Sequence, residues 1–334
     1  MPHPGSSGVL TWQFTLAGAL VGILVGMTGM GGGSLMTPIL ILLFGFDAKV
    51  AVGTDILHGA IFKSFGAVRH RMLGTVHGHL ALWMLLGSAP LSLVGVQIAS
   101  GFGEGTNSTM QKIVGAALIL GGLGFAVKTV VRGRSDDAPF LLTTRDKAIA
   151  VAIGAVGGFI VGLTSVGSGT FFGLAMLLLF PLTAPKVVGT DITHAAALLW
   201  VAGVGHLVHG NVNVHAMGWL LVGSIPGVLL GSQMSISIPE RSLRFSFGLV
   251  LVLSGIKLVD VPHATLIIVV SLAVAVAALI VYIARHGLAH GLPTAGEPPG
   301  TADVHSPGRA PAPAPFDGPG LRAARSHGGS VRRH

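Results

Sequence analysis

The sequence predicts an all-α polytopic membrane protein made of two inverted-topology repeats with glycine-interrupted helices, followed by one extra C-terminal transmembrane helix. Three observations lead to this fold class. The composition is that of a membrane protein, the chain repeats itself at a fixed offset, and a glycine-rich stretch interrupts the apolar pattern once in each repeat.

The composition indicates that hydrocarbon surrounds much of the chain. Of the 334 residues, 51% are hydrophobic and only 10% are charged. Asp, Glu, Lys and Arg are absent from residues 10–46, 148–185 and 192–239, and a span needs about 20 apolar residues. The formal charge of +8 does not indicate a nucleic-acid-binding protein, because Lys and Arg are scattered over short loops and a tail. The absence of cysteine excludes disulfides and thiolate metal sites.

The repeat has an offset of 136 residues. Residues 18–97 align with residues 154–233 without a gap, and 32 of the 80 aligned pairs are identical. The identical pairs include the triplet Gly-Thr-Asp, which occurs at residues 53–55 and again at residues 189–191. After a three-residue shift the match continues with two further glycine pairs, Gly115 with Gly248 and Gly122 with Gly255. The two units are therefore expected to share one fold.

The apolar segments occur in the same order in both units. In unit one they cover residues 11–27, 35–46, 49–68, 79–100 and 112–131, and in unit two residues 148–163, 171–182, 187–208, 216–238 and 244–259. The second segment of each unit is only about 12 residues long and is too short to cross a bilayer, so it predicts a half-helix. A further apolar run at residues 264–284 lies outside the repeat and predicts the extra helix.

These segments define the expected domain organisation. Transmembrane repeat 1 takes residues 1–131, a cytoplasmic linker residues 132–147, transmembrane repeat 2 residues 148–260, and the extra transmembrane helix residues 261–286. Residues 287–334 are rich in Pro, Gly and Ala and predict a disordered cytoplasmic tail.

Basic residues predict the orientation in the membrane. Arg69 and Arg71 follow the third segment of unit one, whereas Arg241 and Arg244 precede the last segment of unit two. If each unit crosses the membrane an odd number of times, these four arginines lie on the same side of the membrane as the basic linker region and the tail. We include Lys128 in this linker region. The positive-inside rule makes that side cytoplasmic. We expect a multi-pass protein of the cytoplasmic (inner) membrane with its N-terminus outside and its C-terminus inside.

The glycine-rich stretch at residues 29–34 and its counterpart at residues 165–170 predict broken helices. Gly costs about 0.5 to 1 kcal/mol in a helix interior, and a broken backbone survives in hydrocarbon only inside protein or against a polar cavity. The half-helix after each break presents N–H groups and a positive dipole end, which favour an anion. Paired breaks predict the midplane site of a secondary transporter. Close helix packing through small residues is the alternative explanation.

Each unit also carries one Asp and one His inside an apolar segment. Asp55 and His58, like Asp191 and His194, are three residues apart and share a helix face. Three roles stay open: fixing the break through hydrogen bonds, proton coupling or gating, and binding a divalent metal with all four side chains. Lys63 is expected to extend its ammonium group to the cytoplasmic interface.

The order of these motifs is similar to that of a known family. The sequence contains GILVGMTGMGGGSLMTPIL followed by AVGTD, and then GGFIVGLTSVGSGT followed by VVGTD and HGNV. Over residues 11–260 this pattern resembles the sulfite exporter TauE/SafE family of membrane permeases. The resemblance implies transport of small anions such as sulfite, sulfoacetate and other sulfur oxyanions or organosulfonates. Ser168 stands where the family usually has Gly, and Asp55 and Asp191 stand where it usually has Ser, which favours proton coupling or a cationic substrate.

The expected function is that of a secondary transporter, acting as an exporter of a small anion, with no enzymatic activity and no cofactor. Its partners are the lipid bilayer and the anion, with no nucleic acid, and homo-oligomerisation is left open. Proton coupling or gating is assigned to Asp55, His58, Asp191 and His194. The candidate substrate-binding residues are Gly31, Gly32, Gly33, Ser34, Thr54, Gly167, Ser168, Gly169, Thr170 and Thr190.

Two alternatives to the anion carrier stay open. One is a divalent metal-ion permease that uses the paired Asp and His residues as ligands. The other is an intramembrane hydrolase, because Ser168 is flanked by glycines and His194 is nearby in the sequence.

Overall fold

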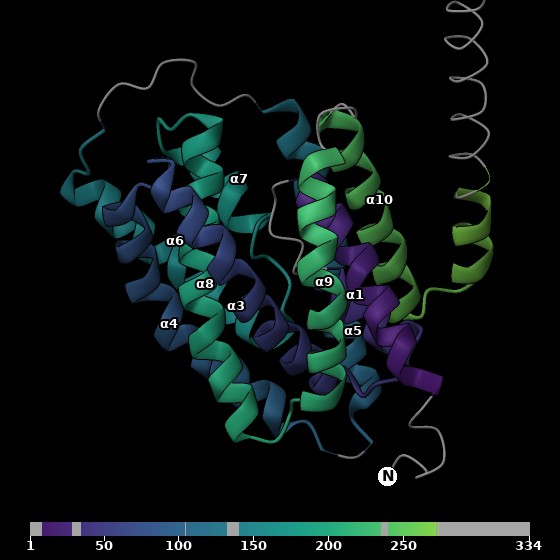
Figure 1. The fold of residues 1–334 in the computed structure, drawn as a ribbon. Helices are drawn as coiled ribbons and strands as arrows, with labels where there is room; N and C mark the ends of the chain where they lie inside the picture. Colours follow the sequence, from purple (N-terminus) through teal and green to yellow (C-terminus); the bar gives the residue numbers. More distant parts are fainter. Residues whose placement is uncertain are drawn as a thin grey trace, which may run out of the picture. The chain divides into compact units, whose positions relative to one another are not determined.

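The computed structural model describes residues 9–28, 35–103, 105–131, 140–234, 240–271 and 273. The elements in these ranges are helices (Figure 1), which confirms the all-α class. They are α1 (Val9–Thr28), α2 (Met36–Leu42), α3 (Ala48–Met72), α4 (Gly78–Gly101), α5 (Asn107–Val130), α6 (Thr144–Thr164), α7 (Phe171–Leu179), α8 (Ala184–Val208), α9 (Val214–Met234) and α10 (Glu240–Val259).

Some predicted features lie outside the described residues. They are the first glycine stretch with Gly31, Gly32, Gly33 and Ser34, residues 132–139 of the linker, and the tail at residues 287–334. Of the predicted extra transmembrane helix, residues 264–271 are helical, and most of the remainder also lies outside the described ranges.

The helices are those of a polytopic membrane protein. Five of the described helices, α4, α5, α6, α8 and α9, are long and apolar enough to cross a membrane, and α1 and α10 contain shorter apolar stretches. Large apolar side chains point outwards: on α4, Leu82, Leu86 and Leu93 are 54%, 54% and 45% exposed. Such faces suit lipid rather than water.

The two half-helices occur where the sequence predicts them. α2 has 7 residues and α7 has 9. At 1.5 Å per residue they span roughly 10 to 14 Å, which is less than half of a hydrocarbon layer about 30 Å thick. The short second segment of each unit is therefore confirmed.

The helices of the two repeats contact each other in matched pairs. α1 packs on α9 as α6 packs on α4, and α3 and α5 pack on their own counterparts α8 and α10. Individual hydrogen bonds recur at the sequence offset. The backbone N–H of His77 donates to Thr190 Oγ1 at 2.9 Å, and that of Asn213 donates to Thr54 Oγ1 at 2.9 Å. The repeats are thus related by a pseudo-two-fold axis.

The direction of the paired helices shows that this axis inverts the topology. Gly115 approaches Gly255 and Gly122 approaches Gly248, so α5 and α10 run in opposite directions. Two helices exchanged by a two-fold axis are antiparallel only when the axis is perpendicular to them. In a membrane such an axis lies in the bilayer plane, which is the inverted arrangement that the charges predict.

More of the described basic residues lie at one end of the molecule than at the other, where Lys49, Lys112 and Lys257 lie. The hydrogen bond from His77 to Thr190 joins the end of α3 to the start of α8. α5 begins beside the start of α3, because Ala48 N–H donates to Asn107 Oδ1 at 2.9 Å, and the antiparallel α10 therefore begins near the end of α5. This common end carries Arg69, Arg71, Arg145, Lys147 and Lys186.

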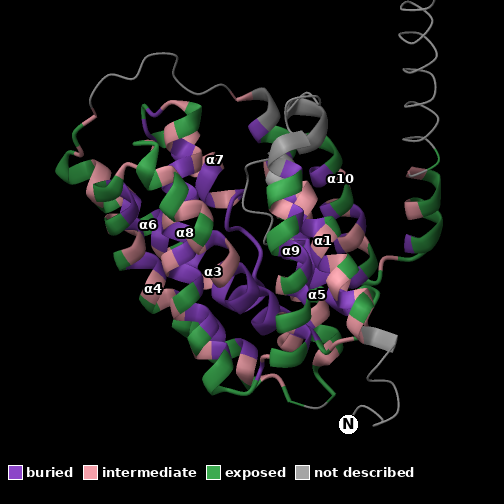
Figure 2. Cartoon of the chain, viewed as in Figure 1, coloured by how far each residue is buried: buried purple, intermediate pink, exposed green. Residues whose placement is uncertain are grey.

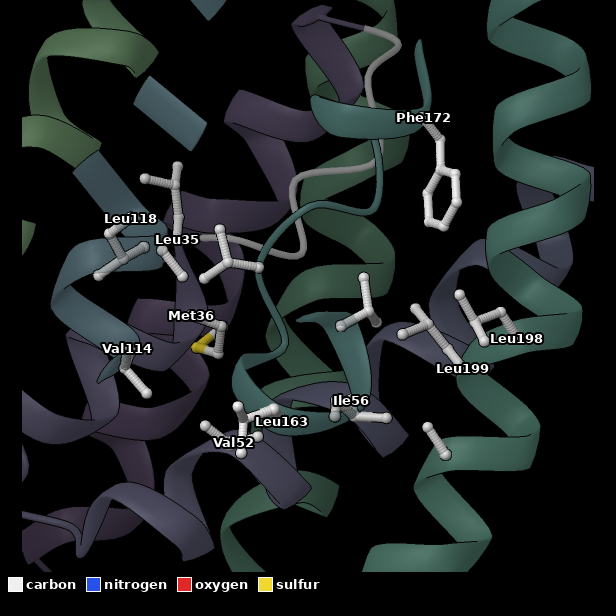
Figure 3. Packing of buried hydrophobic residues seen from close by; sticks show 14 of the residues in the cluster. Leu35, Met36, Val52, Ile56, Val114, Leu118, Leu163, Phe172, Leu198 and Leu199 are labelled. Atoms are coloured by element: carbon white, nitrogen blue, oxygen red, sulfur yellow. The ribbon is translucent and has the colours of Figure 1, made fainter. Parts of the chain in front are cut away.

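The first half of α3 lies at the centre of the bundle. Figure 2 shows it as mostly buried, and the buried residues of α3 extend from Ala48 to Lys63. Around it, Met36 of α2, Leu163 of α6 and Leu198 of α8 belong to one apolar cluster (Figure 3). Polar groups on α3 are therefore held at fixed positions within packed apolar side chains.

Glycines let the backbones of paired helices touch, which supports the packing explanation for many of them. A Cβ placed on Gly154 of α6 would overlap the carbonyl oxygen of Met84 on α4, and one on Gly18 of α1 would overlap that of Leu220 on α9. These two contacts are equivalent at the repeat offset. Close approach of this kind is how membrane helices associate without a hydrophobic driving force.

We expect Gly223→Ala to destabilise the protein and Gly218→Ala, on the same helix, to leave it as stable or more stable. A Cβ on Gly223 would overlap the carbonyl oxygen of Thr15, whereas one on Gly218 meets nothing within 4 Å. Overpacking costs about 1 to 3 kcal/mol, and Ala in place of an unhindered helical Gly gains about 0.5 to 1 kcal/mol. Thermal unfolding midpoints in detergent measure the difference. Equal midpoints would contradict the close packing of α1 on α9.

Candidate functional site

The second glycine stretch is a true interruption between α6 and α7. Residues 165–170 are non-helical and buried. Ser165, Gly167 and Gly169 have φ angles of 65°, 117° and 108°, a region in which glycine is strongly favoured. This explains why every second residue of the stretch is small. For the first stretch, α1 ends at Thr28 and α2 begins at Met36, and residues 29–34 lie outside the described part.

Two lysines from different helices converge on this interruption. Lys63 Nζ on α3 donates to Ser168 Oγ at 2.8 Å, and Lys128 Nζ on α5 donates to the carbonyl oxygen of Gly169 at 3.0 Å. The two side chains are only 3% and 2% exposed. Two expectations are therefore wrong: Lys63 does not extend to the interface, and Lys128 belongs to the interior rather than to a solvated linker.

Asp55 joins three separate elements at the same place. Its Oδ2 accepts hydrogen bonds from the backbone N–H of Thr37 at 3.2 Å, from the Thr37 hydroxyl, and from Ser165 Oγ at 2.9 Å. Thr37 belongs to half-helix α2, whereas Ser165 belongs to the interruption in the other repeat. Asp55 therefore links the first half-helix to the second interruption.

Asp191 has a different environment from its repeat counterpart. It accepts a backbone hydrogen bond from Gly169, and Lys128 and Lys63 are the positive charges that act on it. Gly173 is the counterpart of Thr37, and a Cβ there would overlap Lys128 Nζ and lie 3.4 Å from Asp191 Oδ2. The Lys128 ammonium group thus occupies the space that the threonine side chain takes beside Asp55.

We call Asp55, Asp191, Lys63 and Lys128 the central charge cluster. The two carboxylates and two ammonium groups balance when all four are ionised. The cluster also has unused acceptors: Asp55 Oδ1 and Asp191 Oδ1 are buried and have no hydrogen-bond partner, and the same is true of Thr170 Oγ1. The site therefore has balanced charge and spare hydrogen-bonding capacity.

The two histidines link the repeats rather than joining the carboxylates. His58 Nε2 lies 2.9 Å from Ser224 Oγ on α9, and His194 Nε2 lies 2.9 Å from Ser88 Oγ on α4. These contacts are equivalent at the repeat offset. The ring of His194 also packs edge-on against Phe172 of α7, with centroids 4.5 Å apart.

The metal alternative gains no support from this arrangement. Asp55, His58, Asp191 and His194 all lie within the described residues, and those residues contain no group of three or more His, Asp or Glu that could hold a metal ion. The hydrolase alternative gains no support either, since His194 contacts Ser88. Ser168 instead accepts from Lys63, and it is 1% exposed.

The threonines of the Gly-Thr-Asp triplets hold the connecting loops. Thr54 and Thr190 are fully buried, and their hydroxyls accept the inter-repeat backbone bonds from Asn213 and His77. In this structure each threonine is thus engaged by a loop of the other repeat. Their suggested contact with a substrate remains a prediction.

A small cavity adjoins the cluster. Asp55, His58, Lys63 and Ser224 line it together with apolar residues of α1 and α2. Its volume, taken as the space open to the centre of a water molecule, is about 10 Å³, which is at the lower limit for one water. Asp55 and His58 therefore do face a common space, as their spacing predicts.

Sequence reasoning missed four members of the site: Lys63, Lys128, Thr37 and Ser165. A signal existed for Lys63, because residues eight apart share a helix face and Lys63 follows Asp55 by eight positions. The pairing of Asp55 with Ser165 had no such signal, since it joins residues 110 positions apart.

Substitutions of Ser165 separate the hydroxyl from the backbone geometry. Ser165→Ala removes the bond to Asp55 and keeps a side chain at φ 65°, whereas Ser165→Gly removes the same bond and relieves the left-handed strain. We expect the Ala variant to be the less stable by about 1 to 2 kcal/mol. Thermal unfolding in detergent provides the comparison, and an Ala variant as stable as the Gly variant would contradict the left-handed geometry.

Comparison with known proteins agrees with this architecture. The chain is 37% identical over 249 residues to "Probable membrane transporter protein YjnA" of Bacillus subtilis (strain 168), covering 73% of this chain and 98% of that protein. It is 27% identical over 260 residues to "Probable membrane transporter protein YunE" of the same organism, covering 72% and 94% of the two chains. No solved structure matches the chain.

The relatives share nearly their whole length with this chain, so the comparison covers both repeats. Residues 14–258, which include every helix from α1 to α10 almost completely, match the family described as Sulfite exporter TauE/SafE. The chain is a membrane transporter that belongs to the TauE/SafE sulfite exporter family.

Proposed function

We propose that the chain is a secondary carrier that exports a small anion, a sulfur oxyanion or organosulfonate, and that the anion binds at the second helix interruption between Lys63 and Lys128. The observation that carries this proposal is the convergence of two buried ammonium groups, from two helices, on residues 168 and 169. The family match supports the class of substrate.

The local chemistry favours a negative ligand. Each lysine now donates to a neutral oxygen, Ser168 Oγ or the Gly169 carbonyl. A sulfonate or sulfite oxygen would also place a negative charge against each ammonium group, and this attraction is stronger inside the protein than in water. Half-helix α7 begins at Phe171 and directs its positive end towards the same place. An anion would therefore replace the loop as the partner of both lysines.

The balanced cluster makes the anion and a proton bind together. With Asp55, Asp191, Lys63 and Lys128 ionised, an entering anion adds one uncompensated negative charge. At 4 Å two charges interact by about 4 kcal/mol at an effective dielectric constant of 20. Protonation of either carboxylate removes this penalty, so we propose that Asp55 and Asp191 accept the coupled proton. Such co-transport does not itself drive export, and net efflux follows the gradient of the accumulated substrate.

The histidine–serine contacts supply the gates. His58 with Ser224 and His194 with Ser88 each join a central helix of one repeat to an outer helix of the other. Rocking of one repeat against the other would break one contact while keeping its counterpart, which alternates access to the charge cluster.

We expect Lys63→Gln and Lys128→Gln to weaken anion binding by roughly 10- to 100-fold, because each removes one charge-assisted hydrogen bond worth about 1.5 to 3 kcal/mol. The glutamine amide can still donate a hydrogen bond to the loop at residues 168–169, so the variants are expected to fold and their anion binding can be measured. The measurement is thermal stabilisation of the detergent-solubilised protein by sulfite and by methanesulfonate.

Lys257→Gln is the matched control for the lysine variants. Lys257 is exposed and donates to Thr265 Oγ1 at 3.1 Å, away from the cluster. The Lys257→Gln variant should bind sulfite and methanesulfonate as tightly as the native protein does. If both cluster variants bind as tightly as this control, the lysines do not contact the anion and the proposed site is wrong.

We expect methanesulfonate to bind more tightly as the pH falls, by up to about tenfold per pH unit for one coupled proton. This anion keeps its single charge near neutral pH, so the slope reports protons on the protein. The double variant Asp55→Asn/Asp191→Asn should bind with little pH dependence, because its cluster keeps two positive charges without a titrating carboxylate. Asp260→Asn, at an exposed position, is the control. A native slope in the double variant would rule out the coupling role.

A further inference from the structure

A second, larger cavity opens beside His194, separate from the interruption. It has a volume of about 440 Å³ and lies between the end of α3, the start of α4 and the middle of α8. Arg71, Gly78, Thr193, His194 and Ala197 contribute to its wall, and the outward-facing Leu82 of α4 lies at its edge. This volume exceeds that of a small oxyanion with its nearest waters. We call it the α3–α4–α8 vestibule.

The lining of the vestibule is mostly apolar, but it carries one positive charge and unused polar groups. Arg71 is exposed, and no hydrogen bond or ion pair of its guanidinium occurs with the described residues. Gly78 places the start of α4, with its positive dipole end, on the wall. His194 is 1% exposed and its Nδ1 has no hydrogen-bond partner. No Asp or Glu contributes to the lining.

The positive charge of the vestibule is specific to one half of the molecule. At the repeat offset, the counterpart of Arg71 is Leu207, and that of Gly78 is Val214. His58, the counterpart of His194, instead lines the small cavity beside Asp55.

His194 stands between the vestibule and the charge cluster. It lines the vestibule, contacts Ser88 through Nε2, and packs against Phe172. Asp191 lies one helical turn before it on α8. His194 is thus in contact with the vestibule and with Phe172, and the cluster residue Asp191 is one turn away on the same helix.

We propose that the α3–α4–α8 vestibule binds a small soluble anion, held by Arg71 and the first turn of α4, and that it is the route to the charge cluster from the basic end of the molecule. The argument that an anion binds in the vestibule uses only the residues that line it. The argument that the anion then moves on to the charge cluster rests on the proposed function. The same chemistry would suit the phosphate of a lipid headgroup, which the experiment has to distinguish.

The natural absence of cysteine makes accessibility labelling direct. Ala197→Cys places a thiol of similar size in the vestibule wall, and its repeat counterpart Ile61→Cys is the matched control. Each protein, reconstituted in phosphatidylcholine vesicles, is reacted with an anionic and a cationic methanethiosulfonate reagent. Each rate is divided by that of the same reagent with a small thiol.

We expect the cysteine at position 197 to react roughly tenfold faster with the anionic reagent than with the cationic one. The reason is that the Arg71 guanidinium attracts the anionic reagent and repels the cationic one. Arg71→Gln should lower this ratio several-fold, and millimolar methanesulfonate should slow both reagents. The cysteine at position 61 should react far more slowly. A thiol at position 197 that reacts with neither reagent, or a ratio unchanged by Arg71→Gln, would overturn the proposal.

Two further arms separate the remaining explanations. If methanesulfonate gives no protection while phosphatidylglycerol in the vesicles does, the occupant is a lipid headgroup and the proposal is wrong. The labelling ratio is also measured with Lys63→Gln, which is expected to lose binding at the cluster. An unchanged ratio in that variant supports a vestibule site independent of the cluster, and a lost ratio contradicts it. Failure of the vestibule and failure of the central site are thus distinguished.

Discussion

The requirement that a broken helix inside a membrane find partners for its polar groups governs this structure. Residues 165–170 keep only some helical hydrogen bonds, such as those from Ser165 N–H to Val161 and from Phe171 N–H to Gly167, and lipid offers no partner for the remaining groups. The partners come from other helices: Lys63 on α3, Lys128 on α5, Asp55 on α3 and Asp191 on α8. Of these groups, we propose the two lysines for anion binding and the two carboxylates for the coupled proton. In that proposal the anion competes with Ser168 Oγ and the Gly169 carbonyl for the lysines, so binding would be coupled to a rearrangement of the loop.

Contacts that recur in both repeats hold the helices together, whereas contacts found in only one repeat belong to the charge cluster. The histidine–serine contacts, the threonine bonds to loops and the glycine contacts recur at the offset and form the frame. Within the charge cluster the two carboxylates recur, but Lys63 does not, because its counterpart is Leu199; nor does Thr37, whose counterpart is Gly173. The second half of the molecule therefore holds an interruption surrounded by cations that the frame alone does not require.

The sequence predicts the helices well because hydropathy and the offset are properties of adjacent or regularly spaced residues. Both half-helices, the order of the ten described helices and the inverted arrangement follow from such patterns. The site was predicted less well, since its contacts join distant segments. The sequence places Lys128 with the basic linker region, yet it is a buried part of α5. It places Lys63 at the interface because this cation lies near the cytoplasmic end of its helix, whereas its contact with Ser168 joins residues 105 positions apart.

The pseudo-two-fold axis also bears on how such a chain arose. The two repeats bury equivalent surfaces against each other: α1 on α9 matches α6 on α4, and α5 on α10 is its own equivalent. An interface of this kind is isologous. A half-length ancestor could make the same contacts with a second copy inserted upside down in the membrane. Fusion of the two copies then freed each half to change alone, so that one half could gain lysines without imposing them on its twin.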